Sequence, residues 1–161
     1  MPGINYNELD QMFQVYAICT TVIFFKYIFS QVYGANFNNH PKEDTDKFGE
    51  MPVAEDIKRR ERTFANDMEN IPFDMGIFWA AFVLQSFAII SRNTGMETLT
   101  ITVLIIIYTG SRVIYTICYV CALQPYRTIA WILARLAVVI TACVMISSAF
   151  KVNFQVILPA I

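Results

Sequence analysis

The chain has 161 residues, of which 56% are hydrophobic, and a formal net charge of −1. This charge balance implies no nucleic-acid partner, and the apolar content leaves little room for a separate soluble domain. Four apolar stretches reach the ~20 residues that a helix needs to cross a bilayer. We therefore expect an all-α membrane protein, a four-transmembrane-helix bundle in which residues 1–161 form a single integral membrane domain, because a spanning segment must satisfy its own backbone hydrogen bonds.

The four spans are predicted, in chain order, over residues 12–33, 70–90, 98–123 and 127–150. A long polar loop follows the first span. The second helix is expected to begin near Asp56, where acidic residues favour a helix N-terminus, and to run about three turns before it enters the membrane near Asn70. Ser91 to Gly95 reads as a short turn, and Gln124-Pro125 separates the last two spans.

The distribution of lysine and arginine predicts the orientation. Four spans place both termini and the second loop on one side, which carries Arg92 and Lys151. The other side carries Lys42, Lys47, Lys58, Arg59, Arg60, Arg62 and Arg127. The positive-inside bias therefore puts the first and third loops in the cytosol and both termini away from it.

Four ionisable residues, Lys26, Asp74, Arg112 and Arg135, lie inside the predicted spans. Such groups are costly in hydrocarbon, so they mark a binding site, an ion pair or a polar pathway. When the helices are folded back at the turns, all four are predicted to share one layer. Three positive charges would then face the single negative charge of Asp74, which predicts an additional anionic ligand.

Two polar stripes accompany these charges. On the second helix the stripe is Arg59, Arg62, Asn66 and Glu69; on the third it is Tyr108, Arg112, Tyr115 and Tyr119. Each set follows helical spacing and shares one face. Facing each other, the stripes would line a ligand site, whereas interhelical bonds that only hold the bundle together are the alternative. No Cys/His cluster predicts a metal site.

Several segments resemble the MAPEG family, the membrane-associated proteins of eicosanoid and glutathione metabolism. Residues 61–73 read ERTFANDMENIPF and are similar to the family signature, and residues 112–119 read RVIYTICY and resemble its motif on the third span. Lys26 fits a recurrent family lysine, and residues 125–127 look like the family's entry to the fourth span. The family includes microsomal glutathione transferases, leukotriene C synthase and microsomal prostaglandin E synthase.

The resemblance implies a homotrimer that binds glutathione between neighbouring subunits. Its implied glutathione-binding residues are Lys26, Arg62, Asn66, Glu69, Arg112, Tyr115 and Tyr119, and its implied catalytic residues are Arg127 and Thr128. By resemblance, Arg62 and Arg112 would pair with the glutathione carboxylates, and Glu69 would receive the amino group. Arg127 would stabilise the thiolate, and the Thr128 hydroxyl would donate a hydrogen bond.

The implied activity is that of a glutathione transferase, with glutathione peroxidase activity toward lipid hydroperoxides as a related expectation. The thiolate is the nucleophile, so the enzyme must favour ionisation of the thiol, and a lipophilic electrophile would enter from the membrane lipids. The implied location is the endoplasmic reticulum, with a mitochondrial membrane as the alternative.

This chain also departs from the family pattern. Phe64 replaces the usual histidine, Ala65 stands where the prostaglandin synthase branch has arginine, and the basic stretch after the first span is eroded. These departures favour a second hypothesis, a non-catalytic scaffold or an accessory subunit of a larger membrane complex. A small channel or transporter is a third reading of the embedded charges.

Overall fold

The computed structural model describes residues 6–34, 54–90 and 96–151. These ranges contain the helices α1 (Tyr6–Gly34), α3 (Ala54–Ile90), α4 (Met96–Val120) and α5 (Tyr126–Lys151). Each of the four is long and apolar enough to cross a membrane, which confirms the predicted all-α membrane bundle. The first loop and the turn at 91–95, with Lys42, Lys47 and Arg92, lie outside the described residues.

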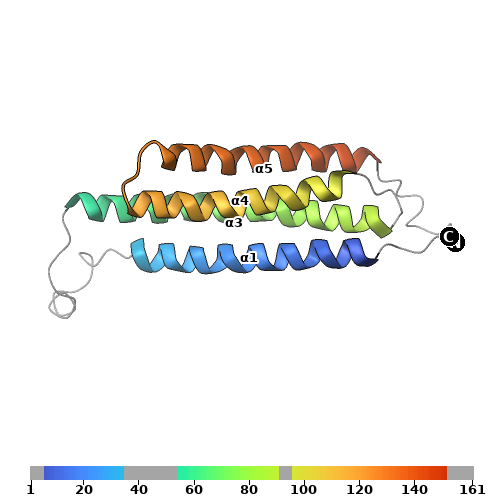
Figure 1. The fold of residues 1–161 in the computed structure, drawn as a ribbon, viewed down its shortest axis with the longest axis horizontal. Coiled ribbons are helices and arrows are strands. Elements are labelled where there is room, and N and C mark those ends of the chain that lie inside the picture. Colours follow the sequence, from blue (N-terminus) through green and yellow to red (C-terminus); the bar gives the residue numbers. More distant parts are fainter. Residues whose placement is uncertain (1–5, 35–53, 91–95, 152–161) are drawn as a thin grey trace.

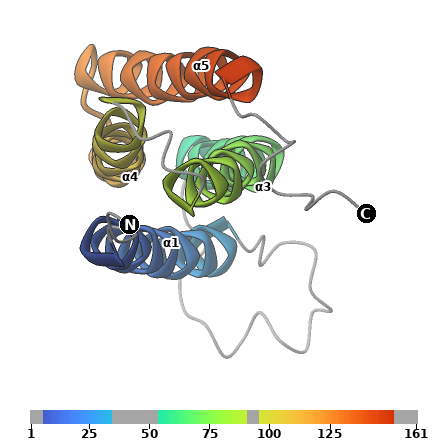
Figure 2. The same ribbon diagram turned by 90° about the vertical axis from the view of Figure 1, so that its right-hand side faces the viewer.

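The helices lie side by side along the long axis of the molecule, and α3 extends beyond the others at one end (Figure 1). Seen along the bundle, α1 and α5 lie on opposite sides of the pair formed by α3 and α4 (Figure 2). Helices α3 and α4 each contact both outer helices and also contact each other. Side chains of all four helices can therefore meet at the α3–α4 contact.

Three helix ends differ from the predicted spans. Helix α1 begins at Tyr6, because the polar residues before the apolar stretch continue the helix, with Glu8 in its first turn. Helix α3 begins at Ala54, close to the expected Asp56, and is continuous through residue 90. Helix α4 ends at Val120, three residues before the predicted end of its span.

The early end of α4 has a local cause. Ala122 adopts a left-handed backbone conformation with φ of 57°. The backbone N–H of Leu123 donates to the carbonyl of Cys118 at 2.8 Å, and the N–H of Ala122 donates to that of Tyr119 at 3.3 Å. This is the hydrogen-bond pattern of a Schellman cap, which ends a helix while satisfying its last carbonyl groups. The chain then enters α5 at Tyr126.

The interior changes character along the bundle. Its middle is apolar and aromatic, with Tyr16 and Phe78 fully buried. Toward the end where α1 begins and α5 ends, Gln85 of α3 donates to Ser148 of α5 at 2.7 Å and accepts a bond of 3.3 Å from Thr98 of α4. Most exposed large side chains are apolar, as expected for helices that face lipid. The buried charged residues gather in the opposite half.

Candidate functional site

A cluster of buried charges joins three helices in this half of the bundle. Asp67 of α3 is fully buried and forms ion pairs with Lys26 of α1 and Arg112 of α4. The Nη2 of Arg112 donates to Asp67 Oδ1 at 2.7 Å, while Ser30 donates its hydroxyl to Oδ2. The Nη1 of Arg112 donates to Asn66 Oδ1 at 3.1 Å. One carboxylate thus serves two cations.

The prediction that Asp74 is the only anion of the charged layer is wrong, because Asp67 supplies a second carboxylate. The buried charges of Lys26, Asp67 and Arg112 sum to one positive charge. The sequence held a signal for this role, since Asp67 lies seven residues before Asp74 and therefore on the same helix face. In the sequence, Asp67 stands out only as part of the motif ERTFANDMENIPF.

A second cluster lies deeper in the bundle. Asp74 is fully buried, accepts a hydrogen bond of 2.9 Å from the Tyr108 hydroxyl of α4 and forms an ion pair with Arg135 of α5. The single predicted layer is therefore two layers, with Lys26 in one and Arg135 in the other. Asp74 was predicted to lie level with Arg112, but it meets Tyr108, about one turn away along α4. The difference arises because the helices do not fold back symmetrically about the assumed turn residue.

Two tyrosines connect the first cluster to the end of the bundle. The guanidinium of Arg112 lies 5.4 Å from the ring centroid of Tyr115, whose ring lies 5.5 Å from that of Tyr119. The guanidinium of Arg127 lies 4.5 Å from the Tyr119 ring, within the range of a cation–π interaction. Both tyrosines are buried and pack with Ala130 of α5. We call this series, from Arg112 through Tyr115 and Tyr119 to Arg127, the aromatic ladder.

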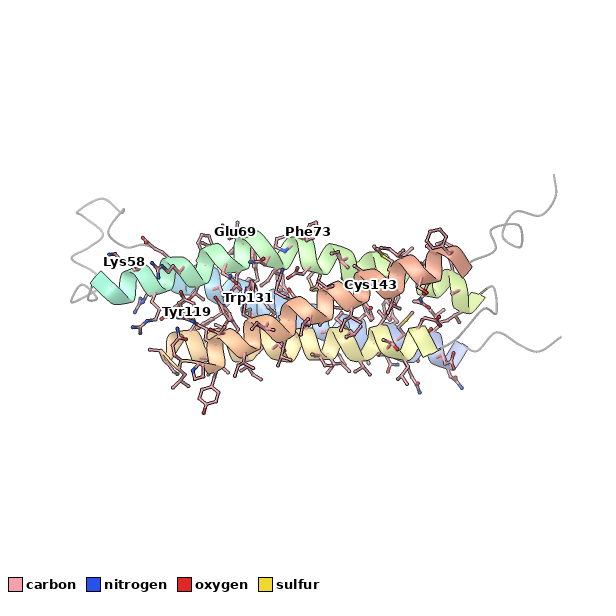
Figure 3. All side chains as sticks on the ribbon, turned by 90° about the horizontal axis from the view of Figure 1, so that it is seen from above. Lys58, Glu69, Phe73, Tyr119, Trp131 and Cys143 are labelled. Atoms are coloured by element: carbon pink, nitrogen blue, oxygen red, sulfur yellow. The ribbon has the colours of Figure 1, made fainter. Side chains whose placement is uncertain are left out.

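Three predicted site residues lie apart from these contacts. Arg62 and Glu69 of α3 and Thr128 of α5 are exposed, and within the described part of the chain none of them has a side-chain hydrogen bond or ion pair. Figure 3 shows Glu69 and Phe73 along one edge of the bundle, with Tyr119 and Trp131 in the same half. Arg62 and Glu69 of the predicted stripe on α3 therefore lie on an outer face, whereas Asn66 contacts Arg112 and the buried Asp67 and Asp74 occupy the inner face.

Two cavities lie elsewhere in the described part of the bundle. One cavity of about 680 Å³ lies between the first turns of α1 and α4, and another of about 240 Å³ with an apolar lining lies between α1 and α3. None of the predicted site residues lines either of them. The predicted residues instead form a buried cationic cluster, a ladder that leads to the bundle end and an outer polar face.

Comparison with known proteins identifies the family. No curated protein matches the chain, and no solved structure matches it. The profile of the MAPEG family matches residues 13–147, which include every predicted site residue. Members of this family are glutathione-related and eicosanoid-type membrane proteins, and they include glutathione transferases. The chain is thus an integral, multi-pass membrane protein that belongs to the MAPEG family.

Proposed function

We propose that this protein is a membrane-bound glutathione transferase that conjugates the glutathione thiolate to lipophilic electrophiles. The observation that carries the proposal is the excess positive charge of the buried cluster, which the aromatic ladder joins to Arg127. A cation buried in a membrane span is costly unless an anion compensates for it. Glutathione, with two carboxylates and an ionisable thiol, supplies that anion.

The free donors for the glutathione carboxylates would come from Arg62. Arg112 already uses Nη1 and Nη2 within the chain, so it would act on a carboxylate mainly through its charge. The exposed Arg62 offers the planar, forked donors that suit a carboxylate. Glu69, about two turns further along α3, is exposed and would receive the amino group. Lys26 and Asn66 would hold Asp67 and Arg112 in place.

Arg127 would stabilise the thiolate. It lies at the bundle end, and no carboxylate of the described residues pairs with it. A guanidinium beside the thiol favours ionisation, at about 1.4 kcal/mol for each unit by which the thiol pKa falls. The neighbouring Thr128 hydroxyl would donate a hydrogen bond to the sulfur. The thiolate would then attack the electrophilic carbon, forming a C–S bond as the leaving group departs or a strained ring opens.

A homotrimer would complete the site. Glu69 is exposed next to Asn70, where α3 is predicted to enter the membrane, and a carboxylate that faces lipid there is unfavourable. A neighbouring subunit that covers this face would remove the cost and bring a second set of helices to the glutathione. The proposed location is the endoplasmic reticulum, with both termini away from the cytosol, and a mitochondrial membrane is the alternative.

The test uses purified, detergent-solubilised protein. Glutathione binding is measured by calorimetry, thiolate by its ultraviolet absorbance, and conjugation with a small generic electrophile. Arg127→Ala is expected to abolish thiolate formation more than binding, whereas Glu69→Ala is expected to weaken binding. Absence of binding at millimolar glutathione would refute the proposal, and equal loss of both properties in both variants would contradict the assigned roles.

A second candidate function is a non-catalytic accessory subunit. It is favoured by the bond between Arg112 and Asn66, since two residues expected to contact glutathione satisfy each other within the chain. The replacements at Phe64 and Ala65 favour it as well. Native-membrane extraction distinguishes the two: an accessory subunit would co-purify in a larger assembly without glutathione turnover. A stable free trimer that turns over glutathione would exclude it.

A further inference from the structure

The deeper cluster has no part in the glutathione contacts described above. Asp74 is fully buried and links α3 to Arg135 of α5, while the Tyr108 hydroxyl of α4 donates to the same carboxylate oxygen. Three helices therefore meet at one carboxylate. This cluster is the polar link between α3 and α5 in the half of the bundle that holds the candidate site.

Its charge balance differs from that of the first cluster. The pair Asp74 and Arg135 is neutral, whereas Lys26, Asp67 and Arg112 carry one excess positive charge. A neutral pair creates no demand for an anionic ligand. A buried ion pair contributes little net stability over apolar packing, but it can specify one arrangement of its helices. The charge balance of the Asp74–Arg135 pair therefore favours a geometric role over a ligand-binding one.

The remaining contacts of α5 near the site involve mainly small side chains. Its buried residues there are Ala130, Ala134 and Ala137, together with the larger Val138. Small side chains allow close helix packing but interlock little with their neighbours. Arg135 follows Arg127 by eight residues on the same continuous helix, so the two lie about 12 Å apart along its axis. A rotation of α5 would move the guanidinium of Arg127 across the Tyr119 ring.

We propose that Asp74 and Arg135 are positioning residues that fix the rotation of α5 and thereby place Arg127 at the glutathione thiolate. The effect on the thiolate rests on the proposed function, whereas the effect on the rotation of α5 does not. The pair acts at a distance of two helical turns and touches no reacting atom. Its loss displaces the thiolate-stabilising guanidinium while leaving the α3 face that would bind the tripeptide intact.

The functional test compares wild type with the double variant Asp74→Asn/Arg135→Gln, which removes both charges and keeps a polar side chain at each position. At a fixed pH well below the thiol pKa, the fraction of saturating glutathione present as thiolate is expected to fall roughly tenfold, equivalent to one pKa unit, while the glutathione Kd changes less than about threefold. The control is Ser148→Ala, which breaks the Gln85–Ser148 link between the same helices at the other end. It should lower thermal stability without changing the thiolate fraction.

An unchanged thiolate fraction in the double variant, or an equal loss in Ser148→Ala, would overturn the proposal. The geometric part is tested without glutathione. Tyr119→Cys and Arg127→Cys are introduced together into a background without other cysteines, and the rate of oxidative cross-linking is measured with and without the Asp74–Arg135 pair. A slower rate without the pair supports positioning, and an unchanged rate refutes it. The cross-linking experiment needs no bound glutathione. It therefore still tests the positioning role if the protein proves not to be a glutathione transferase.

If the double variant does not fold, the exchanged pair Asp74→Arg/Arg135→Asp replaces it. If the ion pair fixes the rotation of α5, the exchanged variant should recover at least part of the wild-type cross-linking rate. A folded exchanged variant that cross-links no faster than the two single variants would count against the proposal.

Discussion

Replacing Asp67 tests how strongly the buried cations depend on one carboxylate. Asp67→Leu leaves Lys26 and Arg112 without their common partner, and the three side chains are exposed by only 6%, 0% and 0%. Removing one member of a buried ion pair costs about 3–5 kcal/mol, because the remaining charge stays buried and uncompensated. Since this carboxylate serves two cations, we expect a loss near the upper limit, about 5 kcal/mol.

The loss is measured as the free energy of unfolding during titration of mixed micelles with a denaturing detergent. Lys26→Met combined with Asp67→Leu removes one uncompensated cation and should recover part of the loss. Glu69→Gln is the control, because this exposed carboxylate on the same helix has no such partners, and we expect a change within about 0.5 kcal/mol. A loss below about 1 kcal/mol for Asp67→Leu would refute the reasoning, since it would mean that water or lipid headgroups already compensate the cations.

Three further predictions concern the turns, the helix contacts and the pH dependence. Gly34→Ala places a Cβ where it overlaps Phe64, so we expect a loss of about 1–3 kcal/mol in the same titration, whereas Gly76→Ala has open space and should be neutral or slightly stabilising. Ala122→Gly relieves a left-handed alanine and should stabilise the fold by about 0.5 kcal/mol after its greater unfolded-state entropy is deducted, and a loss in the titration would contradict this. Arg127→Ala removes a cation from the thiolate and should raise the pKa of bound glutathione, so conjugation should fall most at low pH and recover as pH rises. A profile lowered equally at every pH would argue against that role.

The sequence predicted several residues of the buried cluster and the aromatic ladder, but it also placed exposed residues beside them. Lys26 and Arg112 were found because a charge inside an apolar span is conspicuous in the sequence alone. Tyr115 and Tyr119 were found from their helical spacing to Arg112. Asp67 was missed as the common partner of the cations, because its neighbours in the sequence are polar and its isolation from water arises only when α1 and α4 pack against it.

The depth of each charged residue in the bundle could not be predicted from the sequence either. Folding the helices back at assumed turns predicted one layer, whereas Asp67 meets Arg112 and Asp74 meets Tyr108 in two layers. An error of one or two residues in a turn, together with any tilt of the helices, shifts the predicted partners by a full turn. Arg62 and Glu69 were predicted to face the third helix, whereas both are exposed, because a helix with polar groups on two faces can bury either face.

The four membrane helices follow from the amino-acid sequence alone, since length and hydropathy are local properties and hydrocarbon permits few alternatives to a helix. The chemical types in the site and the membership of the family are likewise written in the sequence. The tertiary structure decided which face of α3 is buried, which carboxylate each cation meets and where Arg127 lies. These three features depend on contacts between helices that are distant in the chain. The energies of such contacts cannot be derived from any single segment.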